Sequence, residues 1–204
     1  MNVNADSESS YHLDFSDWML CKVVFQTIQN LWGPLELDLF VSWLTNQLPR
    51  FVSWKPDPHA EAVAAFSVQW NIVKGYAFPS FCLLGRCLSQ VLRQQVPYFV
   101  LVAPVWKSQP WYPVLLDLFV IFLILILQSP NPLTWKGGSH PLTHLQLGGW
   151  LISGNSMRRK AFHAKLESSS QQLGGKTPLT SMPLHGESGL AGAFQGKLIP
   201  FQHL

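Results

Sequence analysis

Two aromatic rings stand on a turn in the middle of the chain, in the string Phe78-Pro79-Ser80-Phe81. A strand-like run ends immediately before them, and a connecting segment at the surface gains little by exposing bulky rings. Two interpretations account for the string. The rings either pack as a corner of the core, or they form the floor of a pocket in which a flat base could stack.

Side chains that could bind a metal are few and poorly spaced. Cys82 and Cys87 have no second pair of ligands nearby, which argues against a structural zinc site. His140 and His144 have the spacing of ligands on a helix, but Pro141 and the glycine-rich flanks argue against a helix there. Three cysteines and an opening segment without an apolar stretch predict a reduced setting. We therefore expect an intracellular protein, cytoplasmic or nuclear, that is not secreted.

The hydrophobic pattern places the turn within an α/β arrangement. Helical periodicity predicts helices, and uninterrupted apolar runs predict buried strands. The expected order is helix 16–32, strand 35–42, short helix 57–66, strand 70–78, helix 81–94 and strand 98–106. Right-handed crossovers would then build a small, mostly parallel sheet flanked by helices over residues 35–118. Asp38 and Phe78 are expected at the carboxyl ends of neighbouring strands.

The later part of the chain changes in character. Residues 130–167 are expected to be a linker that carries one short basic helix, and residues 168–204 a disordered tail, because Ser, Gly, Pro and Gln are abundant there. The most apolar run, residues 114–128, carries Asp117 and is shorter than the about 20 residues of a membrane helix. We interpret it as a buried helix or strand, or as an unconstrained segment, and expect no stable membrane insertion.

Composition limits the partners of the protein. Hydrophobic residues make up 48% of the 204 residues and charged residues 12%. A soluble protein usually has about a quarter of charged residues. Residues 1–61 hold eight acids and three bases, whereas residues 62–204 hold three acids and eleven bases. The basic second part permits a polyanion partner. A weak nucleic-acid surface would use Lys74, Arg86, Arg93 and Lys107 with the neighbouring aromatic residues.

Four strings, by their order and spacing, carry a resemblance to a known family. They are NVNADSES (2–9), DFSDWMLCKVVFQTIQNLWGPLELDLFVSWLTNQLPRFVSWKPDPHAEAVAAFSVQW (14–70), GYAFPSFCLLGRCLSQVL (75–92) and LVAPVWKSQPWYPVLLDL (101–118). Together they resemble the polyprotein of DIRS-like, tyrosine-recombinase retrotransposons. The resemblance covers roughly residues 1–165, runs from the end of the ribonuclease H domain through a methyltransferase-like domain, and stops short of the recombinase.

The first string resembles the end of that ribonuclease H domain. The family pattern Asn-x-x-Ala-Asp is matched by residues 2–6, and its acid helps to hold the catalytic magnesium. A hard cation needs several oxygen ligands, and only Asp6 of that set is present, so Asp6 would be a vestige of an incomplete metal site. Residues 1–13 are therefore expected to be a remnant without ribonuclease H activity.

Residues 14–129 resemble the phage-type, adenine-specific DNA methyltransferases. In these enzymes a strand ends in an Asp-x-x-x-Ser/Gly loop that lies along S-adenosylmethionine. The string DLFVSWLTN places Asp38, Phe40, Ser42 and Asn46 at the corresponding positions. The family also carries an Asn/Asp-Pro-Pro-aromatic loop, which holds the exocyclic amine of a flipped adenine and stacks on the base. Residues 78–81 occupy that slot.

This slot departs from the family pattern. Phe78 stands where the hydrogen-bond acceptor should be, and Ser80 replaces the second proline. Outside this slot, Ala64 stands where an aspartate often precedes the Ala-Phe pair in the family. A neutral ring cannot orient the amine or stabilise the charge that builds on it. The chain is therefore expected to be a retrotransposon-derived fragment of a reverse transcriptase polyprotein, without catalytic activity.

No cofactor is expected for this fragment, except S-adenosylmethionine if a pocket survives between residues 38–42 and residues 78–81. The first alternative is a small membrane-associated or interaction protein that is anchored by residues 111–128. The second alternative is residual nucleic-acid binding.

Overall fold

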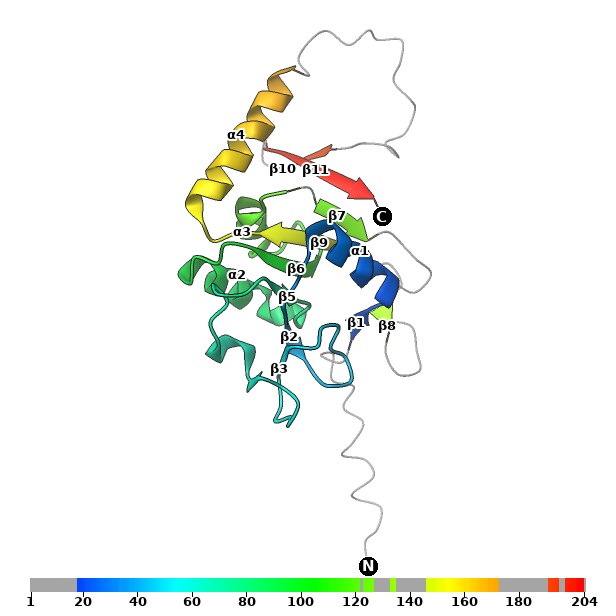
Figure 1. Ribbon diagram of the computed structural model, residues 1–204. Coiled ribbons are helices and arrows are strands. Elements are labelled where there is room, and N and C mark those ends of the chain that lie inside the picture. Colours follow the sequence, from blue (N-terminus) through cyan, green and yellow to red (C-terminus); the bar gives the residue numbers. More distant parts are fainter. Residues whose placement is uncertain are drawn as a thin grey trace, which may run out of the picture.

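A nine-stranded sheet organises the part of the chain that the computed structural model describes, namely residues 18–121, 123–126, 133–134, 146–172, 191–194 and 197–203 (Figure 1). The helices are α1 (Lys22–Trp32), α2 (Leu84–Arg93), α3 (Tyr112–Leu118) and α4 (Ser156–Gln172), with short 3-10 turns η1 (Ala65–Ser67) and η2 (Phe81–Leu83). The strands are β1 (Met19–Leu20), β2 (Leu37–Val41), β3 (Phe51–Ser53), β4 (Ala62–Val63), β5 (Gly75–Ala77), β6 (Phe99–Pro104), β7 (Leu123–Ile126), β8 (Leu133–Thr134), β9 (Leu147–Ile152), β10 (Ala191–Phe194) and β11 (Lys197–His203).

The strands lie in the order β10-β11-β7-β9-β6-β5-β2-β3-β4, and β1 pairs separately with β8. The five strands from β6 to β4 are mutually parallel. The chain moves outward from β2 to β4 on one side, and then returns to continue through β5 and β6 on the other. The place where this direction reverses, between β2 and β5, is the topological switch point of a doubly wound sheet.

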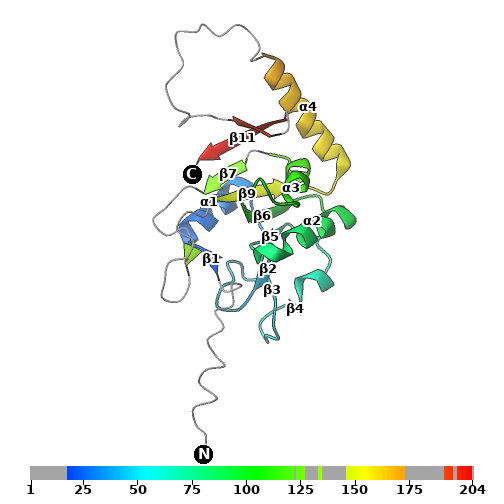
Figure 2. The ribbon, with the colours of Figure 1, turned by 180° about the vertical axis from the view of Figure 1, so that it is seen from behind.

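Helices cover both faces of the sheet, which confirms the predicted α/β class with a mostly parallel sheet. Strand β6 supplies both cores because its side chains alternate between the two faces. Phe99, Leu101 and Ala103 belong to the apolar cluster that includes α2 and α3. Val100 and Val102 belong to the cluster that includes α1. Figures 1 and 2 view these two faces from opposite sides.

The helix that was predicted over residues 57–66 is wrong. Asp57 instead begins a turn, in which its carboxylate accepts the His59 N–H at 2.9 Å and its carbonyl accepts the Ala60 N–H at 3.3 Å. The chain then forms β4, which pairs in parallel with β3. The alanines of this stretch favour a helix locally, but pairing with the exposed edge of β3 decides the outcome.

The apolar run over residues 111–128 is divided between two elements. Its first part forms α3, which Phe119 ends, and its last described part forms β7, which pairs with β9 and β11. The interpretation as a buried helix or strand therefore applies to both parts. Among the described residues, no helix is both long and apolar enough to cross a membrane.

The predicted linker contains a central strand. Residues 147–152 form β9, which runs antiparallel between β6 and β7 in the middle of the sheet. Its glycine pair indicates a loop by composition, but a Cβ on Gly148 would lie only 2.7 Å from a methyl group of Leu123. Close packing therefore requires the glycine, because it leaves space for the side chain of the neighbouring strand.

The predicted short basic helix corresponds to α4, which follows β9 directly. Within the predicted tail, β10 and β11 pair with each other, and β11 extends the sheet alongside β7. Residues 173–190 lie outside the described residues. So do the ribonuclease H remnant at residues 1–13 and the histidines at positions 140 and 144.

Candidate functional site

The two loops that were predicted to form a site emerge from neighbouring strands. Strands β2 and β5 pair in parallel, with Asp38 opposite Tyr76 and Leu39 opposite Ala77. The residues that follow these strands, 42–47 and 78–81, therefore leave the sheet at the same carboxyl edge. This edge lies at the switch point, where open α/β sheets bind their ligands.

Asp38 lies near the start of β2 rather than at its carboxyl end, and it is completely buried. Its Oδ2 accepts the Gln47 N–H at 2.7 Å, while its Oδ1 has no hydrogen-bond partner. Burial raises the pKa of this carboxyl to about 8, although backbone N–H groups of Gln47 and Leu48 act in the opposite direction. The pKa of Tyr76, which lies opposite on β5, is also raised by burial and then by Asp38. Asp38 is therefore buried beneath the loop after β2 and binds it through the hydrogen bond from the Gln47 N–H.

Phe40 turns into the core and not toward the loop surface. Its backbone has a φ of 67°, and the register between β2 and β3 shifts at this residue. The kink directs the ring onto Phe66 and Trp70, with centroids 5.0 Å and 5.9 Å away. A non-glycine residue with positive φ costs about 1–2 kcal/mol, and packing of the ring offsets that cost.

The loop after β2 satisfies its own polar groups. The Ser42 N–H donates to Thr45 Oγ1 at 3.0 Å, and the Ser42 carbonyl accepts the N–H groups of Thr45 and Asn46. The side-chain amide of Asn46 donates to the Leu48 carbonyl at 2.9 Å. Ser42 itself is buried. The polar side chains that the resemblance assigns to cofactor binding are thus engaged within the loop.

The turn after β5 is a packed corner of aromatic residues. Pro79 is buried, whereas Phe78 and Phe81 are half-buried, with ring centroids 6.3 Å apart. Phe81 also meets Trp106 edge to face at 5.1 Å. Phe78 therefore contacts the Phe81 ring and packs against the apolar cluster that includes α1, as the sequence indicates for a residue without an acceptor atom.

Three residues of this edge were not predicted as part of it. Thr45 caps the loop after β2, and Gln47 ties that loop to β1 through a side-chain hydrogen bond of 2.6 Å to the Leu20 carbonyl. Trp106 follows β6 and packs on Phe81. An aromatic residue directly after a predicted strand was the available signal for Trp106. Thr45 acts through hydrogen bonds to Ser42, three residues away, and Gln47 through longer-range bonds to Asp38 and Leu20, and hydrophobic periodicity reports neither.

The four basic residues that were considered for nucleic-acid binding do not gather on one surface. Lys74 precedes β5 and donates to the Gly33 carbonyl, at the amino ends of the parallel strands. Lys107 follows β6, at the carboxyl ends of the same strands. Arg86 and Arg93 belong to α2, where Arg86 lies over the Phe66 ring.

Metal ligands are likewise scattered in the part of the chain that the structure describes. No group of three or more His, Cys, Asp or Glu side chains comes together there. Asp6, the vestigial magnesium ligand suggested by the resemblance, lies outside these residues.

No protein-family model matches the chain, and no curated protein is significantly similar to it.

Proposed function

We propose that this chain is a retrotransposon-derived domain with a methyltransferase-like fold that has lost methyl transfer. The order of the strands supports the fold assignment. Numbered along the chain, β2 to β7 and β9 lie in the order 3-2-1-4-5-7-6, with the seventh strand antiparallel. This is the arrangement of the S-adenosylmethionine-dependent methyltransferase fold, whose parallel part is doubly wound.

Fold alone does not establish function, but the turn after β5 lacks a group that methyl transfer requires. Phe78 leaves that strand beside the loop of β2 and packs near Phe81. Transfer to an exocyclic amine needs an acceptor that fixes the amine in line with the methyl group. Misplacement by about 1 Å can cost about a hundredfold in rate, and a phenyl ring provides no acceptor at all.

The loop after β2 supports the same conclusion. Asp38 is inaccessible beneath it, and the Ser42 and Asn46 side chains accept or donate within the loop. A polar cofactor would have to compete with these internal hydrogen bonds. Each such bond contributes about 1 kcal/mol, and a buried partner left unpaired costs about 1–3 kcal/mol.

The direct test is a labelled methyl-transfer assay on adenine-containing DNA, alongside calorimetry with S-adenosylmethionine. We expect no transfer from the unmodified chain, and transfer above background would contradict the proposal. The double variant Phe78→Asn with Ser80→Pro restores the acceptor and the second proline. Ser80 has a φ of −53°, which a proline ring accepts, so this replacement fits the existing turn.

The matched control is Ser80→Pro alone, which stiffens the turn without adding an acceptor. Transfer by the double variant but not by the control would locate the loss of activity in Phe78. If none of the three proteins transfers a methyl group, the loop after β2 has also lost its part in the activity. The retrotransposon origin has its own test, because the flanking coding DNA should continue into polymerase and recombinase frames.

A further inference from the structure

Strand β7 would be the last strand of the sheet if the β10–β11 hairpin were removed. On one side β7 pairs with β9, and on its other side the described part of the chain supplies only β11. Figures 1 and 2 both show the hairpin beside β7, away from β2 and β5. The cover of this edge is therefore a segment that follows all the other strands in the sequence.

The edge that β11 covers is apolar and has no guard against pairing. Leu123 and Leu125 of β7 are buried in the cluster that includes α2 and α3, and Ile124 and Ile126 are buried in the cluster that includes α1. Residues 120–127 contain no charged residue, proline or glycine. Natural edge strands usually carry charges, prolines or bulges that prevent pairing with another chain. A bare β7 would therefore accept a further strand.

The ladder between β11 and β7 is short. It joins three residue pairs, from Phe201 opposite Leu123 to His203 opposite Leu125. Pro200 directly precedes them and has no N–H group to donate to a longer ladder. A parallel pair is slightly less stable per residue than an antiparallel one, and a two-stranded hairpin alone is marginal in water. The hairpin is therefore a weakly held cover that can be exchanged.

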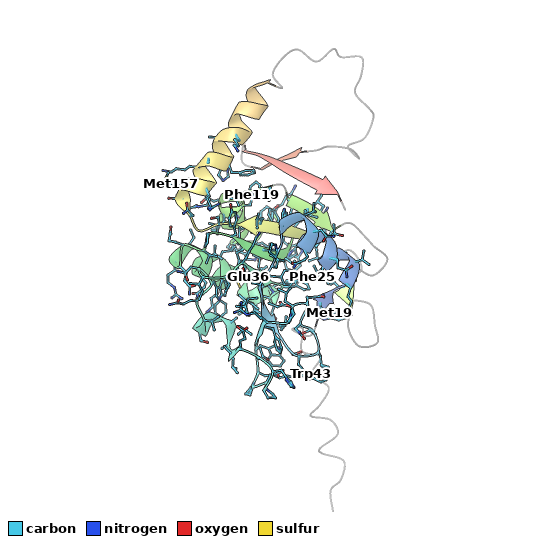
Figure 3. The ribbon with its side chains drawn as sticks, viewed as in Figure 1. Met19, Phe25, Glu36, Trp43, Phe119 and Met157 are labelled. Carbon is cyan, nitrogen blue, oxygen red and sulfur yellow. The ribbon has the colours of Figure 1, made fainter. Side chains whose placement is uncertain are left out.

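A long connection joins the hairpin to the rest of the protein. Helix α4, from which it starts, is fixed on α3 by an ion pair of 2.5 Å between Arg159 and Asp117. The Phe162 ring also meets Phe119 at 5.2 Å, and Figure 3 shows Phe119 at the base of α4. Residues 173–190 then lead from α4 to β10. Eighteen residues span up to about 60 Å when extended, which is enough to reach β7 of a second molecule.

We propose that the β7 edge is a strand-accepting site, which binds the β10–β11 hairpin of the same molecule at low concentration and that of a second molecule at high concentration. The ladder is the same in both arrangements, so their balance depends on concentration. A tether of this length gives the molecule's own hairpin an effective concentration on the order of 1 mM, and a second copy competes near that value. This inference goes beyond the proposed function, because it uses neither the loop after β2 nor the turn after β5.

The first measurement is the molar mass of the full chain by light scattering over a range of concentrations. We expect a monomer at about 10 µM and a growing fraction of dimer toward about 1 mM. Successive N–H groups of a strand point to alternate sides, so Gln202→Pro with His203→Pro removes at least one donor to β7. This proline variant should lose the dimer. Gln202→Ala with His203→Ala is the matched control, because it keeps both N–H groups and should dimerise as the parent does.

The second measurement uses a fluorescently labelled peptide of residues 191–203 as the probe. Its anisotropy should show binding to the proline variant about tenfold or more tighter than to the parent, in which the tethered hairpin occupies the edge. The alanine variant should bind the peptide as weakly as the parent. Circular dichroism and thermal melting establish that all three proteins keep their fold.

Larger aggregates of the proline variant would support the proposal, because they indicate an uncovered apolar edge. Three results would overturn it: a parent that remains monomeric at about 1 mM, a proline variant that dimerises as the parent does, or a peptide that binds the proline variant no more tightly than the parent. Growth of the parent beyond the dimer would also overturn it, because a closed exchange of hairpins leaves no β7 edge uncovered.

Discussion

Replacing Asp38 by asparagine tests how the candidate edge is supported. The carboxyl is completely buried, and burial raises its pKa from the ordinary value of 3.8 to about 8. In the unfolded chain the same group ionises near its ordinary value. Between these two values the folded protein therefore holds a proton that the unfolded chain has lost. Folding stability must then fall as pH rises through this window.

The magnitude follows from the width of the window. A shift of one unit corresponds to about 1.4 kcal/mol, so a window of about four units amounts to roughly 5–6 kcal/mol. The contribution of the Asp38 carboxyl to folding stability is fully present below its pKa in the unfolded chain, and it is lost progressively as the pH rises to its pKa in the folded protein. Asparagine does not titrate, and its Oδ1 can still accept the Gln47 N–H. Its amide group, however, would occupy the place of the oxygen that has no partner, at a cost of about 1–3 kcal/mol.

We therefore expect the two stability curves to cross. Near pH 4 the Asp38→Asn variant should be less stable than the parent, and near pH 8 it should be more stable by about 2–5 kcal/mol. Urea denaturation at a series of pH values, followed by tryptophan fluorescence, measures both curves. Asp38→Leu is the control, because leucine also does not titrate, but it removes the hydrogen-bond acceptor for the Gln47 N–H. Parallel curves for the parent and Asp38→Asn would refute the reasoning.

Two further predictions concern backbone strain and thiol access. Ala64 has a φ of 67°, a backbone conformation that favours glycine, and its N–H donates to the Ser53 carbonyl. Ala64→Gly should therefore raise the free energy of unfolding by roughly 0.5–1 kcal/mol. The control Ala161→Gly, in the middle of α4, should lower the free energy of unfolding by about 1 kcal/mol. Urea unfolding compares them, and a loss of stability in both variants would contradict the strain argument. Cys82 is exposed, whereas Cys87 is buried and its thiol pKa is raised by that burial. Iodoacetamide should therefore label Cys82 before Cys87 in the folded chain, and peptide mass spectrometry measures both labelling rates. Equal labelling rates under native conditions would count against the burial of Cys87.

The sequence by itself determined the elements whose pattern is local. The apolar run that became β6 predicts a strand buried on both faces. Helical spacing predicts an inward face with Cys21, Val24, Phe25, Ile28, Leu31 and Trp32, of which Leu31 is exposed, and α1 begins at Lys22 and not at residue 16, because residues 19–20 pair as β1. Gly33 ends that helix as expected. The absence of an acceptor at Phe78 is likewise a property of the residue type. These features follow from periodicity and side-chain chemistry, which act over a few residues.

Only the tertiary structure decided which segments pair and which side chains remain in water. Residues 147–152 become a central strand because β6 and β7 leave a space between them, although their composition is typical of a linker. A shift of register at Phe40 turns into the core a side chain that the resemblance assigns to cofactor binding. Asp38 is buried, and Trp43 is exposed, through hydrogen bonds to residues 9 and 14 positions away. Such partners are fixed by strand order and packing, so no local pattern could predict them.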